Sequence, residues 1–244
     1  MVYIANVALA VFMASFIAAL AGFGVSTILI PVLAMFLPLP VVLLLVALIR
    51  LMLNLWQFFL TKRDVNWKVV INFGLVGAIA SFFGGLVVAY QPQFVIRLLG
   101  GFLVFYVIFL FFNPTIRIKL KYMAAVIGGG INGFFAGVFG MRGALQSMFL
   151  SAFSLPVRAH VATLSFIALI IDCARISAYW IGGVRFSVNL LYIILLILPV
   201  SFIGITLANY VSGKVSQRIF RFIVAFFLFL IGIRFLIWGT GYIF

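Results

Sequence analysis

Long apolar segments fill almost the whole chain and leave little else from which to build a fold. They cover residues 3–22, 25–37, 41–60, 68–90, 94–112, 122–139, 143–154, 157–180, 187–210 and 216–238. A helix needs about 20 apolar residues to cross roughly 30 Å of hydrocarbon, and most of the segments approach that length. A membrane β-barrel would alternate apolar and polar residues instead. The sequence therefore predicts an all-α polytopic membrane protein.

The few charged residues are strongly biased in sign. Sixteen Lys and Arg face two acids, which gives a formal charge of +14, while 68% of the residues are hydrophobic. In a soluble domain this bias would indicate nucleic acid. In a membrane protein it indicates loops that face the cytoplasm and anionic lipid headgroups. Membrane lipids are therefore the expected surroundings, and nucleic acid is not an expected partner.

The reactive side chains are too few and too scattered for an enzyme. The chain has one cysteine, Cys173, one histidine, His160, and two acids. They form neither a metal-ligand cluster nor a nucleophile with an oriented base, so no catalytic residue, metal or cofactor is expected. The first apolar segment has no basic residue before it, unlike a cleavable signal peptide, and we expect it to stay in the mature protein.

The chain contains an internal repeat. Phe-Gly at 23–24 recurs at 139–140, and Leu-Pro at 39–40 recurs at 155–156, both 116 residues later. The spacing drifts to 119 residues further on, where Gly85 corresponds to Gly204. We predict a first membrane repeat over 1–116, a basic cytoplasmic linker over 117–121 and a second membrane repeat over 122–244.

Two topologies fit this repeat. Segments 25–37 and 143–154 are too short to cross alone, so each could be the return arm of a re-entrant helix hairpin that three crossings follow. An odd number of crossings would invert the second repeat relative to the first. Alternatively, each short segment continues into the next one as a single bent crossing, which gives eight spans and parallel repeats.

Charge placement favours the inverted repeats, because Lys and Arg accumulate in short cytoplasmic loops. The hairpin topology puts ten cationic residues on one side and two on the other, whereas eight spans divide them seven to four and leave Arg158 inside a segment. We therefore predict a multi-pass plasma membrane protein with both termini outside the cytoplasm and the loops 61–68, 113–121 and 211–217 inside. The ten residues are Lys62, Arg63, Lys68, Arg117, Lys119, Lys121, Arg158, Lys214, Arg218 and Arg221.

The polar stretches at the two helix breaks form the predicted transport site. A break near the bilayer midplane exposes backbone N–H groups whose partial positive charge suits an anion. Arg142 adds a planar, permanently charged fork that matches sulfonate, sulfite or carboxylate oxygens. The alternative is that Arg142 reaches an interface or pairs with Asp172. The predicted substrate-binding residues are Gly24, Ser26, Thr27, Arg50, Asn54, Gln57, Gly140, Arg142, Gly143, Gln146 and Ser147.

Several of these assignments have a structural alternative. Asp172 and Arg175 are three residues apart and share a helix face, so a neutralising pair is the favoured interpretation. The other interpretation makes Asp172 a proton carrier or a gate. His160 is either a proton-coupling group or a hydrogen-bonded polar residue. Arg50 either lines an anion path or contacts backbone carbonyls.

The polar residues Asn132, Thr163 and Ser165 either line the path or form helix-to-helix hydrogen bonds. The glycine run from Gly128 to Gly140 is explained by close helix packing without any ligand.

Several motifs carry a family resemblance. The second half contains the glycine-rich stretch 128–143, Leu155-Pro156, Ala162-Thr163-Leu164-Ser165 and Tyr179-Trp180-Ile181-Gly182, and the first half contains Ala21-Gly22-Phe23-Gly24 followed by Ile30-Pro31. Together they resemble the sulfite exporter TauE/SafE family over almost the whole chain. The resemblance implies transport of sulfite, thiosulfate, sulfoacetate or related organosulfonates. Arg142 stands where the family usually has glycine, and Ser147 where it often has proline.

The sequence thus predicts a secondary transporter, expected to be an exporter, that moves a small sulfur-containing anion by alternating access. Coupling to a proton or a sodium ion and assembly as a homodimer are further partner hypotheses. The alternatives are a passive anion channel, a carrier for another small carboxylate, and a membrane assembly subunit without transport.

Overall fold

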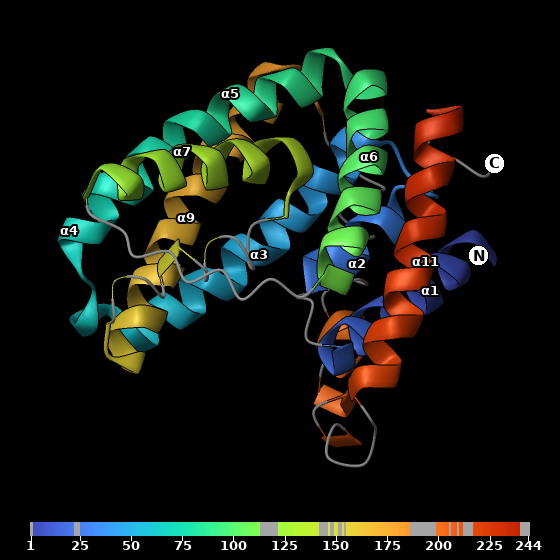
Figure 1. Cartoon of the computed structure of the whole chain (residues 1–244), viewed down its shortest axis with the longest axis horizontal. Coiled ribbons are helices and arrows are strands. Elements are labelled where there is room, and N and C mark those ends of the chain that lie inside the picture. The colour runs from blue at the N-terminus through green and yellow to red at the C-terminus, as the bar shows by residue number, and fades with distance from the viewer. Residues whose placement is uncertain are drawn as a thin grey trace. The chain divides into compact units, whose positions relative to one another are not determined.

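The computed structural model describes residues 2–21, 25–112, 122–141, 146, 149–150, 153, 155–185, 199–204, 206–208, 210–211 and 217–239. All regular structure in these residues is helical (Figure 1), as the sequence predicted. The α-helices are α1 (Val2–Ala21), α2 (Val25–Leu33), α3 (Leu39–Thr61), α4 (Trp67–Val69), α5 (Val76–Tyr90), α6 (Pro92–Phe112), α7 (Tyr122–Phe139), α9 (Val157–Ile181) and α11 (Gln217–Trp238). A 3-10 turn, η1 (Lys62–Asp64), follows α3, and a π-helical stretch, η2 (Val70–Leu75), joins α4 to α5.

Among the described residues, three helical stretches are long and apolar enough to cross a membrane. They are Leu39–Asp64, Trp67–Tyr90 and Val157–Ile181, and several shorter apolar helices accompany them. The helices end close to the predicted boundaries, because the residues that interrupt a helix act on their neighbours in the sequence. The helix α1 ends at Ala21, before the predicted break at 23–24, and α7 ends at Phe139.

The chain forms two compact units, which we describe separately. The first contains residues 1–42, 92–114 and 185–244, and the second contains residues 43–91 and 115–184. Each unit therefore combines segments from both predicted repeats.

In the first unit, α6 and α11 pack against each other in opposite directions. A Cβ at Gly100 would lie 2.6 Å from the carbonyl oxygen of Gly232, so the two backbones touch. Gly239 approaches Arg97, while Gly232 approaches Val104. Residue numbers fall along α11 as they rise along α6, so the helices are antiparallel.

In the second unit, α5, α7 and α9 run in the same direction. Gly77 of α5 meets Gly133 of α7, and Ser81 meets Gly137 one turn later. The same holds between η2 with α5 and α9, where Gly74 of η2 meets Ile170, and Gly77, Gly85 and Ala89 of α5 meet Ile171, Ala178 and Gly182. Both helix pairs are therefore parallel.

Phe149, in the segment between α7 and α9, lies back along α7. The ring of Phe149 lies against Gly128, more than two turns before the end of α7 at Phe139. Phe149 also packs on Phe73, with ring centroids 6.0 Å apart. The apolar core of this unit follows from these contacts and contains Val69, Val70, Phe73, Ala136, Leu150, Ile167 and Ile171.

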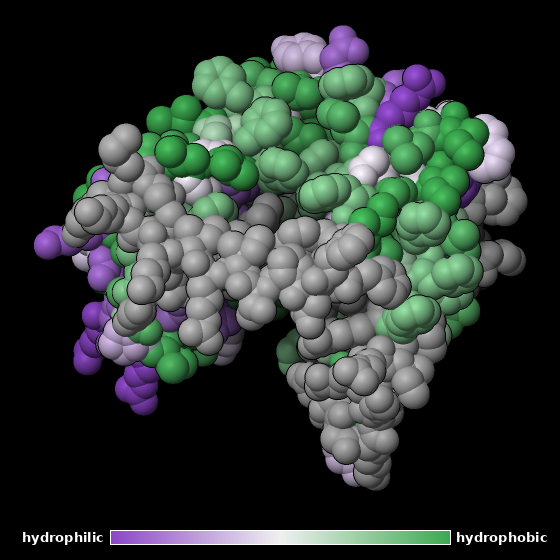
Figure 2. Space-filling model, viewed as in Figure 1, coloured by the Kyte–Doolittle hydropathy of each residue, from purple (hydrophilic) through white to green (hydrophobic). Residues whose placement is uncertain are grey.

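The outer surface of these helices is apolar, as expected of helices that face lipid. Ile71, Leu75, Ile79 and Phe83, spaced four residues apart along η2 and α5, are all half or more exposed. Figure 2 shows hydrophobic residues covering much of the described surface, with hydrophilic residues toward its edges. An apolar surface of this extent is typical of helices that lie in a membrane.

Candidate functional site

A buried ion pair lies at the centre of the polar residues of the second unit. Asp172 and Arg175 of α9 are 0% and 1% exposed, and Asp172 Oδ1 accepts a 2.8 Å hydrogen bond from Arg175 Nε and lies 2.7 Å from Arg175 Nη2. The amide of Asn54 in α3 donates to Asp172 Oδ2 at 3.3 Å. The three-residue spacing on one helix face made the pair predictable. The structure adds Asn54, which belongs to the first predicted repeat.

The guanidinium of Arg175 also reaches the end of α7. Its Nη1 donates to the carbonyl oxygen of Ala136 at 3.3 Å, and the hydroxyl of Tyr179 donates to the carbonyl oxygen of Gly137 at 2.7 Å. The last carbonyls of a helix lack partners within it. Gly140 closes α7 with a φ of 67°, a left-handed conformation that suits glycine, and its N–H bonds to Ala136 at 3.0 Å. Two α9 side chains thus help to cap the helix break.

Replacing Tyr179 with phenylalanine should weaken this cap. The ring is 0% exposed and would keep its packing, but the Gly137 carbonyl would lose a hydrogen bond worth about 1 kcal/mol. We expect a small drop in melting temperature of the purified protein. Tyr90→Phe, at the exposed end of α5, is the matched control. Equal melting temperatures for Tyr179→Phe and the parent would argue against a stabilising cap.

The other predicted residues of this unit have different surroundings. Gln146 is buried and donates to the carbonyl oxygen of Leu164 at 3.2 Å. Arg50 is half-buried on α3, one turn before Asn54, whereas Gln57 is exposed. His160 is half-buried in the first turn of α9.

Two of the residues with a predicted alternative role, Thr163 and Ser165, form hydrogen bonds with the backbone. Thr163 Oγ1 accepts from the N–H of Asn66 at 2.9 Å, which ties the start of α9 to the loop before α4. Ser165 donates to the carbonyl oxygen of Val161 in its own helix at 2.9 Å. In contrast, neither amide atom of the fully buried Asn132 has a hydrogen-bond partner in the described part of the chain.

The first unit holds the remaining described residues. Ser26 is buried and Thr27 half-buried at the start of α2, where N–H groups without helical partners lie. Four predicted substrate-binding residues, Gly24, Arg142, Gly143 and Ser147, lie outside the described residues. Their assignments stay predictions.

Tyr179 is not among the site residues predicted from the sequence, because that prediction started from charged residues. It follows Arg175 by four residues and Asp172 by seven, so all three share one helix face. That spacing was the available signal.

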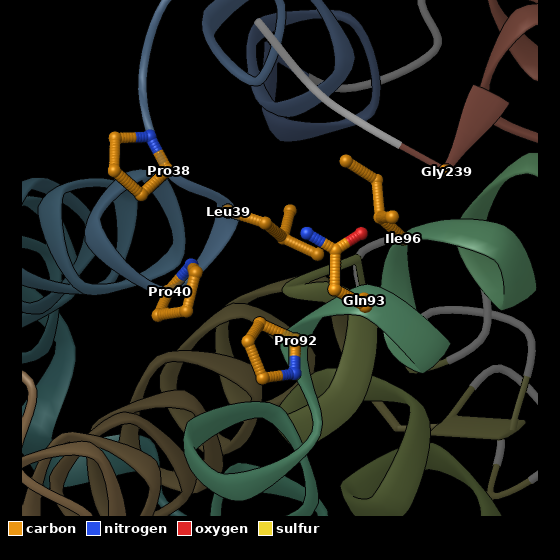
Figure 3. A pocket seen from close by; sticks show the side chains of 7 residues that line it. All are labelled: Pro38, Leu39, Pro40, Pro92, Gln93, Ile96 and Gly239. Carbon is orange, nitrogen blue, oxygen red and sulfur yellow. The ribbon is translucent and has the colours of Figure 1, made fainter.

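A small pocket in the first unit offers little for an anion. It has a volume of about 130 Å³ and is lined by Pro38, Leu39, Pro40, Pro92, Gln93, Ile96 and Gly239. Figure 3 shows the proline rings and the Gln93 amide around it. Its lining lacks a positive charge, so the ion pair region of the second unit is the better candidate site.

The chemistry of the second unit fits ion binding and helix positioning. Among the described residues, no three His, Cys, Asp or Glu side chains gather into a group that could hold a metal. The charged and polar groups instead converge on the end of α7, directly before Arg142 in the chain.

Comparison with known proteins agrees with this chemistry. The sequence model of the sulfite exporter TauE/SafE family matches residues 7–235. Neither the curated proteins nor the solved structures give a match. The match spans both helix breaks and nearly all of the apolar segments, and it makes this chain a multi-pass membrane transporter rather than an enzyme. The chain belongs to the sulfite exporter TauE/SafE family.

Proposed function

We propose that this protein is a secondary transporter that exports a small sulfur-containing anion, such as sulfite, thiosulfate or an organosulfonate, across the plasma membrane by alternating access. The family match over residues 7–235 is the observation that carries the proposal. The substrates that this family implies are oxyanions. Such an anion needs hydrogen-bond donors and positive charge in a water-poor site.

The paired helix breaks are the proposed binding site. Gly140, which has a left-handed backbone, follows the last residue of α7 and lies two residues before Arg142. We propose that Arg142 is the main counter-ion and that Ser26, Thr27 and Gly143 supply donors at the starts of the return arms. The buried position of Ser26 at the start of α2 supports its part in this proposal.

Helix directions support an inverted repeat with re-entrant hairpins. In that topology the last helices of the two repeats, α6 and α11, run in opposite directions, and α5 and α9 run in the same direction. Eight full crossings would reverse both relations. The glycine contacts give antiparallel α6 and α11 and parallel α5 and α9, as the inverted repeat requires.

A contact between α9 and the loop after α3 supports the proposed orientation. The hydrogen bond from Asn66 to Thr163 puts the second turn of α9 beside the loop that follows α3. Exposed Arg158 therefore lies at the end of the second unit that also carries exposed Lys62, Arg63 and Lys68. A cluster of cations at one end favours the cytoplasmic side, and we place both termini on the opposite side.

An anion panel tests the substrate and the counter-ion together. The melting temperature of the detergent-purified protein is measured with sulfite, thiosulfate, sulfate, sulfoacetate, taurine, lactate and chloride. A bound anion stabilises the folded state by about 2.7 kcal/mol at 100 times its dissociation constant. We expect a sulfur anion to raise the melting temperature of the parent, and Arg142→Ala to abolish that rise.

Arg158→Ala is the matched control, because it removes an exposed arginine of the same repeat. It should keep the full anion response. An undiminished response in Arg142→Ala would overturn the counter-ion assignment, and no response to any sulfur anion would overturn the substrate class. Counterflow of radiolabelled sulfite in proteoliposomes then separates a carrier from a channel, since only a carrier exchanges bound substrate.

A further inference from the structure

Three oxygen atoms contact the Arg175 side chain and its neighbour Tyr179 in the second unit. They are Oδ1 of Asp172 and the carbonyl oxygens of Ala136 and Gly137, while Oδ2 of Asp172 accepts from the amide of Asn54. The two carbonyls belong to the last turn of α7, where the helix dipole is negative. A carboxylate beside the C-terminal end of a broken helix is the kind of oxygen set that holds a sodium ion in other transporters built on broken helices.

In this protein a guanidinium occupies that position. Arg175 Nε and Nη2 lie 2.8 and 2.7 Å from Asp172 Oδ1, and Nη1 lies 3.3 Å from the Ala136 oxygen. The positive group thus bridges the carboxylate and the helix end, as an alkali cation would. The hydroxyl of Tyr179 donates a hydrogen bond to the other carbonyl oxygen, that of Gly137, at 2.7 Å.

We infer that Arg175 is a tethered cation that takes the place of a coupling sodium ion at the end of α7, so that transport by this protein does not require sodium. The inference rests on the proposed function, because it states that the proposed transport does not need sodium. Arg175 acts here as a positioning residue. It holds the helix break in place without touching the substrate.

The composition of the chain supports the inference. The chain has two acids, and the other one, Asp64, is exposed in η1 next to Lys62 and Arg63. Asp172 is therefore the carboxylate that an intramembrane cation would need. A permanently charged guanidinium at 2.7 Å leaves no room for a sodium ion between Asp172 and Ala136.

Removing the tethered charge should uncover the cation site. Arg175→Ala leaves the Asp172 carboxylate and the Ala136 carbonyl facing the space that the guanidinium filled. The melting temperatures of the parent, Arg175→Ala and Arg175→Gln are compared in chloride salts of sodium, potassium and N-methyl-D-glucamine at equal ionic strength. We expect the parent to be indifferent to the cation, and both variants to melt about 3 °C higher in sodium or potassium than in N-methyl-D-glucamine.

The double variant Asp172→Asn with Arg175→Ala is the control, since it lacks the carboxylate and should lose the cation effect. Variants at Arg175 that are indifferent to sodium and potassium would overturn the inference, as would an effect that persists in the double variant. Arg175→Gln keeps an amide for the Ala136 carbonyl, so it provides the measurement if Arg175→Ala does not fold.

A transport assay on the parent protein is independent of any variant. Sulfite uptake into proteoliposomes should be equal with sodium and with N-methyl-D-glucamine. Uptake that falls tenfold or more without sodium would overturn the inference and leave the proposed function standing. No uptake of any sulfur anion under either condition would overturn the proposed function instead, and the melting experiment would still decide whether Arg175 fills a cation site.

Discussion

Replacing Asp172 with alanine is expected to destabilise the protein by about 3–5 kcal/mol, because it leaves a buried guanidinium without its counter-ion. Asp172 is 0% exposed, and two nitrogen atoms of Arg175 lie within 2.8 Å of its Oδ1. Asn54 would also lose its acceptor across the unit. Unfolding of the purified protein by a denaturing detergent, followed by circular dichroism, measures the loss.

Asp64→Ala is the control for Asp172→Ala. Asp64 is the other acid, and it is exposed in η1, so Asp64→Ala should change the free energy of unfolding by less than about 0.5 kcal/mol. In the double variant Asp172→Asn with Arg175→Ala, the total loss should be smaller than the sum of the two single losses, since neither charge is left alone. Equal losses in Asp172→Ala and Asp64→Ala would show that the ion pair contributes nothing to the fold.

The local part of this structure could be predicted from the sequence. Helix ends depend on neighbouring residues, so the breaks after Ala21 and Phe139 followed from the Phe-Gly motifs. The contact between Asp172 and Arg175 followed from their spacing on one helix. The charge count favoured the inverted-repeat topology over eight spans, and that topology stays a prediction.

Contacts between distant segments could not be predicted in the same way. Nothing near Asn54 in the sequence indicates that its amide reaches Asp172, 118 residues later. Likewise, the use of Arg175 to cap the Ala136 carbonyl depends on how α9 lies against α7, which periodicity does not determine. The fold also brings the acid of the second repeat to Asn54, one turn along α3 from Arg50, whose role stays a prediction.

Replacing Gly133 with alanine is expected to cost at least about 3 kcal/mol, because a Cβ there would collide with the backbone of Gly77. Backbone atoms cannot rotate away as a side chain does, so α7 would have to move off α5. That movement would also disturb the contacts of Gly129 with Phe73 and of Gly137 with Ser81, one turn on either side. The loss is measured by the same detergent unfolding.

Gly130→Ala is the matched control on the same helix. A Cβ at Gly130 would meet Val76 Cγ1 at 3.7 Å, an ordinary contact, and alanine favours a helix over glycine by about 0.5–1 kcal/mol. Gly130→Ala should therefore leave stability unchanged or raise it. Opposite signs for two glycines three residues apart would identify the close parallel contact between α5 and α7 as the cause.

Because that contact fixes where α7 ends relative to α9, sulfite uptake should fall with Gly133→Ala and not with Gly130→Ala. Equal losses at both glycines would instead indicate that the whole glycine run matters only for the helix itself, and the parallel pairing of α5 with α7 would lose its support.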